Sequence, residues 1–299
     1  MSLPMMENPS GEYCFVNGNK VKLVSDEARD LLRPVADTIF YESIRVSEGV
    51  LLFFENHMLR LLQSIEAASD FPVDTDSLYD DAMRLIRESD PPVDHGNIRI
   101  VVTDKLRLVH LTSVTYPSQE LFHQGVVTSQ LPWERREPNV KIFRDDYKTA
   151  IGKALTCPTK MGMPYEILLA NRSGQIIEGG RSNFFVYYHN VIYSAPDDAI
   201  LIGVTRRYVL QAIKQAGYSW QIGSYTLSEL MEMKSEKDPE RTVAVFLTSS
   251  PFDILPIRAI DDVMFDSANH EALRRISEQY QSIVSHYISI RKTSAEPLE

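Results

Sequence analysis

The sequence predicts an α+β protein built from two domains. Apolar runs of strand length and apolar repeats of helical spacing both occur throughout the 299 residues, which indicates mixed secondary structure. They do not follow one another as regular strand–helix–strand units, so the pattern disfavours a doubly wound parallel sheet. The length also exceeds the usual size of one domain. We therefore expect a small α+β domain and a larger, strand-rich domain.

The first part of the chain combines short strands with two helices. Asn17-Gly18 is a typical hairpin turn between two apolar runs. Met58, Leu61 and Ile65 recur at helical spacing, which predicts a helix. The elements expected here are two strands within 14–21, a hairpin formed by 39–46 and 50–54, helices at 57–68 and 78–86, and strands at 97–103 and 107–114.

The second part is dominated by strands and ends in a long helix. Residues 116–138 are richer in polar residues and contain three prolines, Pro117, Pro132 and Pro138, a composition typical of a connecting segment. We therefore place a small domain at 12–120, a linker at 121–137 and a large domain at 138–299. In the large domain we expect strands at 167–170, 175–177, 184–188, 191–193 and 242–247, and helices at 205–216 and 269–287.

Composition excludes several functional classes. The 41 acidic and 31 basic residues give a net charge of −10, whereas nucleic-acid binders usually carry a basic surface. Two cysteines are too few to staple a chain of this length, which favours a reducing compartment. The polar N-terminus predicts no secretion signal, and no apolar run is long enough to span a bilayer. We expect a cytoplasmic protein with no nucleic-acid or membrane partner, and the absence of zinc-type Cys and His spacings predicts no metal site.

Three polar sequences follow or precede apolar elements in the second half. Glu178-Gly179-Gly180 ends an apolar run with a carboxylate and two glycines, which permit a close approach of other groups. Gly203-Val204-Thr205 precedes a predicted helix, whose free amides attract phosphate. Thr248-Ser249-Ser250 adds hydroxyl groups at the end of a predicted strand. Taken singly, each is also compatible with an ordinary bend, cap or turn.

A fourth candidate lies on the helix predicted at 57–68. His57, Arg60 and Ser64 share one face of that helix. A guanidinium on this face has the fork geometry that suits phosphate. Alone, Arg60 is also compatible with a solvated surface side chain.

The order and spacing of these motifs resemble the fold-type IV pyridoxal-phosphate enzymes, the class IV aminotransferase family. That family includes branched-chain aminotransferases, D-amino-acid aminotransferases and aminodeoxychorismate lyases. The resemblance runs from about Tyr13 to Ile257. The motifs that carry it are Tyr41-Glu42-x-x-Arg45, His57-x-x-Arg60-Leu61, Lys141, Glu178-Gly179-x-x-Ser182-Asn183, Gly203-Val204-Thr205-Arg206 and Thr248-Ser249-Ser250.

The resemblance implies that pyridoxal 5′-phosphate forms an internal aldimine with a lysine. Lys141 resembles that lysine and would also move the proton between the substrate Cα and the cofactor. It precedes Glu178 by 37 residues, slightly more than the family spacing, whereas Lys148 precedes it by 30, slightly fewer. We prefer Lys141, keep Lys148 as the alternative, and regard Lys153 as a remote third.

The resemblance also assigns the other cofactor contacts. Glu178 would face the pyridine nitrogen and keep it protonated, because a carboxylate favours a charged partner. A protonated ring is the better electron sink. The remaining assignments are Arg60, Val204, Thr205, Ser249 and Ser250 for the phosphate, Leu201 for the flat face of the ring, and Ser182 and Asn183 as braces around Glu178.

Substrate recognition is less specific in the sequence. The resemblance places Tyr41, Arg45 and Arg99 in the substrate pocket, while Asp104 stands where D-amino-acid enzymes have an arginine. The leading interpretation is an aminotransferase acting on a small amino acid, with branched-chain substrates included, and a 2-oxo acid. The alternatives are a lyase of the aminodeoxychorismate type and a cofactor-free binding protein on the same fold. The resemblance further implies a homodimer.

Overall fold

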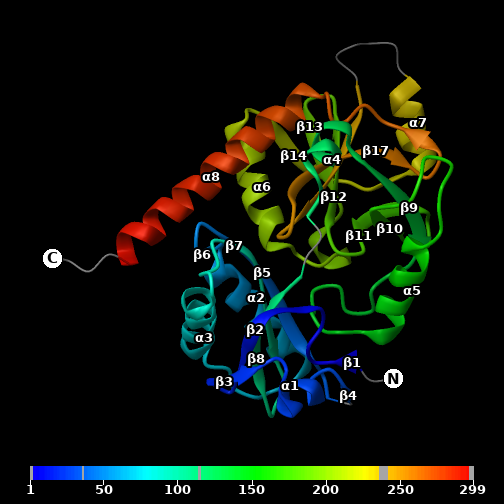
Figure 1. Cartoon of the computed structure of the whole chain (residues 1–299). Helices are drawn as coiled ribbons and strands as arrows, with labels where there is room; N and C mark the ends of the chain where they lie inside the picture. The colour runs from blue at the N-terminus through cyan, green and yellow to red at the C-terminus, as the bar shows by residue number, and fades with distance from the viewer. Residues whose placement is uncertain (1–2, 36, 114–115, 236–241, 296–299) are drawn as a thin grey trace. The chain divides into compact units, whose positions relative to one another are not determined.

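The computed structural model describes residues 3–35, 37–113, 116–235 and 242–295. The chain divides into two compact units (Figure 1). Unit 1 comprises Met1–Thr115, Val140–Asp146 and Val284–Glu299, and unit 2 comprises Tyr116–Asn139 and Tyr147–Ile283. Each unit combines helices with a sheet, so the predicted α+β fold is confirmed.

Unit 1 is built on a six-stranded antiparallel sheet with the strand order β3-β2-β8-β7-β5-β6. A separate two-stranded pair joins β1 to β4. The elements are β1 (Leu3–Pro4), β2 (Pro9–Val16), β3 (Asn19–Lys22), α1 (Asp26–Asp30), β4 (Pro34–Val35), β5 (Phe40–Ser47), β6 (Val50–Leu51), α2 (Phe54–Ala68), α3 (Thr75–Glu88), β7 (His95–Val102) and β8 (Arg107–Thr112).

The two faces of this sheet carry different side chains. Successive residues of a strand point to opposite faces, and α2 and α3 cover the face that carries Ile44 and Ile98 (Figure 1). Tyr41 and Arg45 alternate with Ile44 along β5, so they lie on the other face. The pattern of apolar residues on α2 and α3 that predicts both helices is therefore explained by burial against one face of the sheet.

Unit 2 contains a ten-stranded sheet with the order β14-β13-β12-β16-β17-β9-β10-β11-β15, and β18 pairs with β17. An additional pairing between β11 and β12 closes the six strands β12, β16, β17, β9, β10 and β11 into a ring. The strands are β9 (Val126–Pro132), β10 (Glu166–Ala170), β11 (Gln175–Gly179), β12 (Asn183–Tyr188), β13 (Val191–Ser194), β14 (Ser219–Ile222), β15 (Tyr225–Thr226), β16 (Ala244–Ser249), β17 (Asp253–Ile260) and β18 (Val263–Met264).

Helices surround this sheet in unit 2 (Figure 1). The pairing of β11 with β12 joins Glu178 to Asn183, so the predicted Glu178 motif lies where the ring of strands closes. The helical elements are α4 (Gln119–Gln124), α5 (Asp145–Leu155), the 3₁₀ turn η1 (Asp197–Ala199), α6 (Val204–Gln215), α7 (Leu227–Ser235) and α8 (Glu271–Ala295), of which α8 continues into unit 1 from Val284.

The domain boundaries differ from the predicted ones. The segment 121–137, expected to be a linker, contains β9, which lies between β17 and β10 in the sheet of unit 2. Val126 and Val127 are buried there, and burial of these apolar side chains outweighs the polar, proline-rich composition around them. Residues 140–146 belong to unit 1, where Ile142 forms a β-bridge with Phe40. Val114, the last residue of the strand predicted at 107–114, lies outside the described residues.

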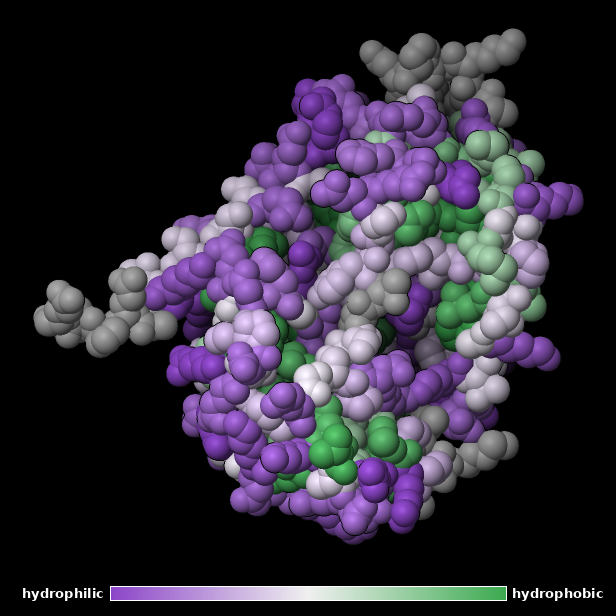
Figure 2. Space-filling model, viewed as in Figure 1, coloured by the Kyte–Doolittle hydropathy of each residue, from purple (hydrophilic) through white to green (hydrophobic). Residues whose placement is uncertain are grey.

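The visible surface is mainly hydrophilic, with apolar residues in scattered groups (Figure 2). Cys14 is buried, Cys157 is exposed, and both are free thiols. Among the described helices, none is both long and apolar enough to cross a membrane.

Candidate functional site

Glu178 lies near the end of β11 and is only 1% exposed. Its Oε1 accepts a hydrogen bond from Arg135 Nε at 2.6 Å, and its Oε2 accepts one from the backbone N–H of Leu201 at 3.1 Å. Burial raises the pKa of the Glu178 carboxyl, and the positive charge of Arg135 opposes that shift. A carboxylate has about four acceptor positions, so Glu178 retains capacity to accept a hydrogen bond from a ligand.

Arg135 and Tyr147 form a connected network beside Glu178. Arg135 Nη2 donates to Tyr147 Oη at 2.7 Å, and Tyr147 Oη donates to the Gly180 carbonyl at 2.6 Å. The guanidinium also lies over the Tyr147 ring, 4.3 Å from its centroid, which is a cation–π distance. Neither residue is predictable from the sequence, because no motif or local spacing connects them to Glu178.

Helix α5 packs directly against the turn that follows Glu178. A Cβ added to Gly180 would come within 2.9 Å of Ile151 Cδ1, so glycine permits this close approach. Lys148 lies on α5 between Tyr147 and Ile151, the two residues that contact the turn. Its side chain is exposed, yet partial burial lowers the pKa of its ammonium group. This environment favours the neutral amine that nucleophilic chemistry requires.

Asn183 positions the segment that carries Leu201. Asn183 Nδ2 donates to the Leu201 carbonyl at 2.8 Å, while the Leu201 N–H donates to Glu178. A Cβ on Gly203 would collide with Asn183 Oδ1, which explains the glycine. Ser182 Oγ donates to Glu166 Oε2 at 3.2 Å. These contacts are consistent with the bracing roles predicted for Ser182 and Asn183.

The N-terminus of α6 offers backbone amides to an anion. Gly203 is the N-cap and provides no side-chain hydrogen bond to the first turn. The Thr205 and Ser250 hydroxyls lie 3.4 Å apart, and Ser249 Oγ donates to the Arg181 carbonyl at 2.9 Å. Amides at a helix N-terminus together with adjacent hydroxyls are chemically suited to phosphate oxygens.

Arg60 and its neighbours form a buried charged cluster in unit 1. Glu42 on β5 accepts two hydrogen bonds from Arg60, at 2.7 and 2.6 Å, and one from His57 Nδ1 at 2.7 Å. Burial alone would raise the pKa of Glu42, but the charges of Arg60 and Lys141 bring it well below its usual range. Burial also lowers the pKa of His57, so the neutral ring donates its Nδ1 proton to the carboxylate.

Lys141 belongs to unit 1 as well. Its backbone N–H donates to Ser64 Oγ at 3.1 Å, and its Nζ lies 4.9 Å from the centroid of the Tyr41 ring. The two candidate lysines thus fall in different units, Lys141 with Glu42 and Lys148 with Glu178.

The three predicted substrate residues share one face of the unit 1 sheet. Arg99 is the direct cross-strand partner of Ser43, which alternates with Ile44, so Arg99 lies on the same face as Tyr41 and Arg45. Arg99 Nη1 donates to Glu7 Oε2 at 2.7 Å, and its guanidinium lies 5.1 Å from the Tyr41 ring centroid.

Each unit therefore gathers part of the predicted site. Unit 1 contains Tyr41, Arg45, Arg60, Arg99 and Lys141. Unit 2 brings the remaining predicted residues together around the end of β11 and the start of α6; these are Glu178, Ser182, Asn183, Leu201, Val204, Thr205, Ser249 and Ser250.

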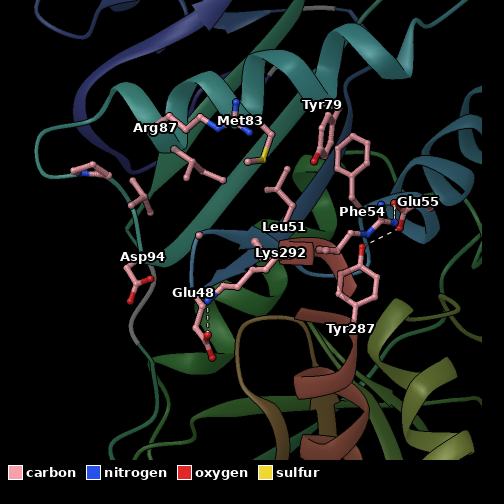
Figure 3. Close-up of a pocket in the computed structure, with 16 residues that line it drawn as sticks. Glu48, Leu51, Phe54, Glu55, Tyr79, Met83, Arg87, Asp94, Tyr287 and Lys292 are labelled. Atoms are coloured by element: carbon pink, nitrogen blue, oxygen red, sulfur yellow. Dashed lines mark hydrogen bonds and ion pairs between the residues drawn. The ribbon is translucent and has the colours of Figure 1, made fainter. Parts of the chain in front are cut away.

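A cavity of about 330 Å³ lies elsewhere in unit 1 (Figure 3). Leu51, Phe54 and Met83 line its apolar part, and ion pairs such as Glu48–Lys292 lie at its edge. None of the predicted site residues lines this cavity. Among the residues that the structure describes, no group of three or more His, Cys, Asp or Glu side chains is arranged to bind a metal ion.

Comparison with known proteins gives a consistent family. Residues 39–260 match the family model described as amino-transferase class IV. A D-alanine aminotransferase from Bacillus licheniformis is 25% identical over 238 residues, covering 74% of this chain and 78% of the relative. An aminodeoxychorismate lyase from Bacillus subtilis (strain 168) is 22% identical over 261 residues, covering 83% and 86%.

A solved structure shows the same fold. It is a branched-chain amino acid aminotransferase from Escherichia coli, and it superimposes with a TM-score of 0.71. The match covers 92% of this chain and 95% of that one at 18% sequence identity.

Proposed function

Because the chain belongs to the class IV aminotransferase family, we propose that it is a pyridoxal-phosphate-dependent aminotransferase that exchanges an amino group between a small amino acid and a 2-oxo acid. One observation carries the proposal. The buried Glu178 carboxylate accepts a hydrogen bond from the Leu201 amide, in the segment that leads into the N-terminus of α6. An acid and an anion site therefore lie close together within unit 2.

The residues present fit this cofactor. Glu178 would accept a hydrogen bond from the pyridine nitrogen and favour its protonated form. The first amides of α6, Val204 and Thr205, would bind the phosphate with Ser249 and Ser250. When bound, the cofactor supplies an electron sink for charge that develops at the substrate Cα.

We propose that Lys141 bears the cofactor, as the family resemblance implies, and keep Lys148 as the alternative. Lys141 adds its charge to the cluster around Glu42, which also contains Arg60, a predicted phosphate ligand. Lys148 lies in the same unit as Glu178, on a helix that packs against the Glu178 turn, and partial burial lowers the pKa of its ammonium group. The amine that bears the cofactor would also take and return the proton at the substrate Cα.

The first half of the transfer reaction tests this function. Protein loaded with pyridoxal phosphate is mixed with single amino acids in the absence of any acceptor, and the visible absorbance and the 2-oxo acid are followed. We expect loss of the visible band with one equivalent of 2-oxo acid for the correct substrate. A wild-type protein that binds no pyridoxal phosphate would favour the cofactor-free binding protein and contradict the proposal.

A lyase of the aminodeoxychorismate type is the second candidate, since such an enzyme is among the relatives. The two reactions differ in their need for an amino acceptor. An aminotransferase stops after one equivalent unless a 2-oxo acid is added, whereas a lyase turns over continuously. Product analysis with and without 2-oxoglutarate therefore separates them.

We further propose that Tyr41, Arg45 and Arg99 contribute to substrate recognition and that the enzyme is a cytoplasmic homodimer. The shared sheet face of the three residues supports the first part. The family resemblance supports the dimer, and the two free thiols are compatible with a reducing compartment. Light scattering of the purified protein measures the oligomeric state directly.

A further inference from the structure

We propose that Arg135 is a positioning residue, which keeps the Glu178 carboxylate ionised and oriented and connects it to the helix that carries Lys148. This inference rests on the proposed function, because the effect of Arg135 is measured through the absorbance and the reaction of the bound cofactor. Neither the family motifs nor the local sequence identify Arg135, which lies 43 positions before Glu178 in the chain.

The geometry joins three elements through one guanidinium. Arg135 follows β9, Glu178 is the last residue but one of β11, and Tyr147 lies in the first turn of α5. Arg135 Nε donates to Glu178 at 2.6 Å, and Nη2 donates to Tyr147 at 2.7 Å. Because the guanidinium group is planar and holds its N–H donors in fixed directions, these two bonds fix the orientation of the carboxylate relative to the start of α5. Lys148 is the next residue after Tyr147 on that helix.

The electrostatics explain why an arginine is needed here. Glu178 is almost fully buried, and removal from water favours its neutral form. The nearby carboxylate of Glu166 acts in the same direction. Arg135 is the cation that opposes both effects through a charge-assisted hydrogen bond. Without it, Glu178 would hold its proton to higher pH and would no longer stabilise a protonated ring nitrogen.

Tyr147 has a separable part in this network. Its hydroxyl accepts from Arg135 and donates to the Gly180 carbonyl at 2.6 Å, so it links Arg135 to the turn that follows Glu178. Tyr147→Phe removes that hydroxyl and leaves the ion pair of Arg135 with Glu178 in place. We therefore expect Tyr147→Phe to affect orientation while the charge state of Glu178 is unchanged.

The test compares Arg135→Gln, Arg135→Lys and Tyr147→Phe with a matched control. Arg172→Gln serves as the control because the Arg172 side chain is 94% exposed and its ion pair with Glu134 is long, at 3.8 Å. Each variant is loaded with pyridoxal phosphate, and sodium borohydride trapping first verifies that the cofactor is attached. The absorbance of the bound cofactor is then titrated with pH, and the half-reaction rate is measured.

In Arg135→Gln, we expect the pH transition that reports Glu178 ionisation to move upward by about 1–3 units, the usual effect of losing one adjacent opposite charge. Arg135→Lys keeps the charge and loses the planar fork, so its transition stays near that of wild type while its half-reaction slows. Tyr147→Phe slows the half-reaction without moving the transition, and Arg172→Gln changes neither.

Two results would overturn the inference. One is an Arg135→Gln titration that coincides with wild type while trapping remains complete, which would leave the proposed function intact. The other is an Arg135→Lys titration displaced as far as that of Arg135→Gln, which would show that charge is not what Arg135 supplies. Failure of the wild-type protein to trap the cofactor is a different outcome and contradicts the proposed function itself.

Discussion

The buried carboxylates of Glu42 in unit 1 and Glu178 in unit 2 have opposite environments. Glu42 in unit 1 accepts two hydrogen bonds from Arg60 and a third from His57. Glu178 in unit 2 accepts one from Arg135 and one from a backbone amide. The pKa of Glu42 lies well below its usual range, whereas burial raises the pKa of Glu178.

The contrast separates a structural carboxylate from one suited to a ligand. Three charge-assisted or buried bonds occupy most of the acceptor capacity of Glu42 and hold β5 to α2. Glu178 is just as buried but has fewer partners, so its ionised form is less stabilised. A buried acid with spare acceptor capacity and a raised pKa is typical of a functional site.

The largest expected effect is on stability, in the Glu42→Ala variant. Removing this carboxylate leaves Arg60 and His57 buried without their partner, and breaking a buried ion pair in this way costs about 3–5 kcal/mol. Urea unfolding measures the loss. The control is Glu88→Ala, since Glu88 pairs with Lys20 at the surface, and we expect little change there. Equal destabilisation in Glu42→Ala and Glu88→Ala would contradict the structural role assigned to Glu42.

The next effect is on chemistry, in the Glu178→Gln variant. The amide keeps the shape and accepts the bond from Arg135, but it cannot favour a protonated ring nitrogen. We expect the half-reaction to slow by about 100- to 1,000-fold, the usual result of losing one preorganised electrostatic group, while cofactor trapping persists. A Glu178→Gln enzyme with the wild-type rate would remove Glu178 from the mechanism.

A smaller effect is expected for cofactor affinity in Ser250→Ala. Its hydroxyl lies beside Thr205 at the start of α6, and loss of one hydrogen bond to a charged group lowers affinity by about tenfold. Equilibrium binding of pyridoxal phosphate and of pyridoxal, which lacks the phosphate, separates the phosphate contact from the rest. Equal losses for both ligands would place Ser250 outside the phosphate site.

The same comparison applied to Arg60→Gln tests the predicted phosphate role of that residue. Because Arg60 makes two bonds to Glu42, this variant should lose stability together with any phosphate contact. A selective loss of pyridoxal phosphate over pyridoxal would support the predicted role, and a loss of stability alone would assign Arg60 to the Glu42 cluster.

The smallest effect is the pH dependence of stability, which should have opposite signs for the two acids. The pKa of Glu42 is lowered in the folded state, so its stabilisation is present above its ordinary value of 4.5 and is lost as the pH falls below it. The pKa of Glu178 is raised from the same value, so its contribution favours folding at low pH and is lost as the pH rises through the folded pKa. The urea midpoints of Glu42→Gln and Glu178→Gln are measured from acid to neutral pH, each as a difference from wild type. As the pH rises, wild type should gain stability relative to Glu42→Gln and lose stability relative to Glu178→Gln. Parallel curves would contradict this assignment.

Elements with strong local patterns were predictable from the sequence. The α2 repeat of Met58, Leu61 and Ile65 is buried as expected, and the Asn17-Gly18 turn joins β2 to β3. Helix α5 was missed: it buries only one of its residues, Ile151, and it begins soon after the segment that was expected to be a linker. Strand β9 was missed because its place between two distant strands, β10 and β17, is set by tertiary pairing.

The candidate site follows the same rule. Glu178, Thr205 and Ser250 stand out because each belongs to a short motif at the end of an element. Arg135 and Tyr147 carry no such motif, and only the folded chain brings them to Glu178 and Gly180. The choice between the two lysines also depends on the fold, since spacing along the chain left both open.

The most direct test of the account is to reduce the pyridoxal-phosphate complex with sodium borohydride and map the modified peptide by mass spectrometry. Trypsin cleaves after Arg144, which lies between Lys141 and Lys148, so the two lysines fall in different peptides even when one of them is modified. We predict that the cofactor mass lies on Lys141 and that Lys141→Ala abolishes the labelling. Label on Lys148, persisting in Lys141→Ala, would contradict this assignment.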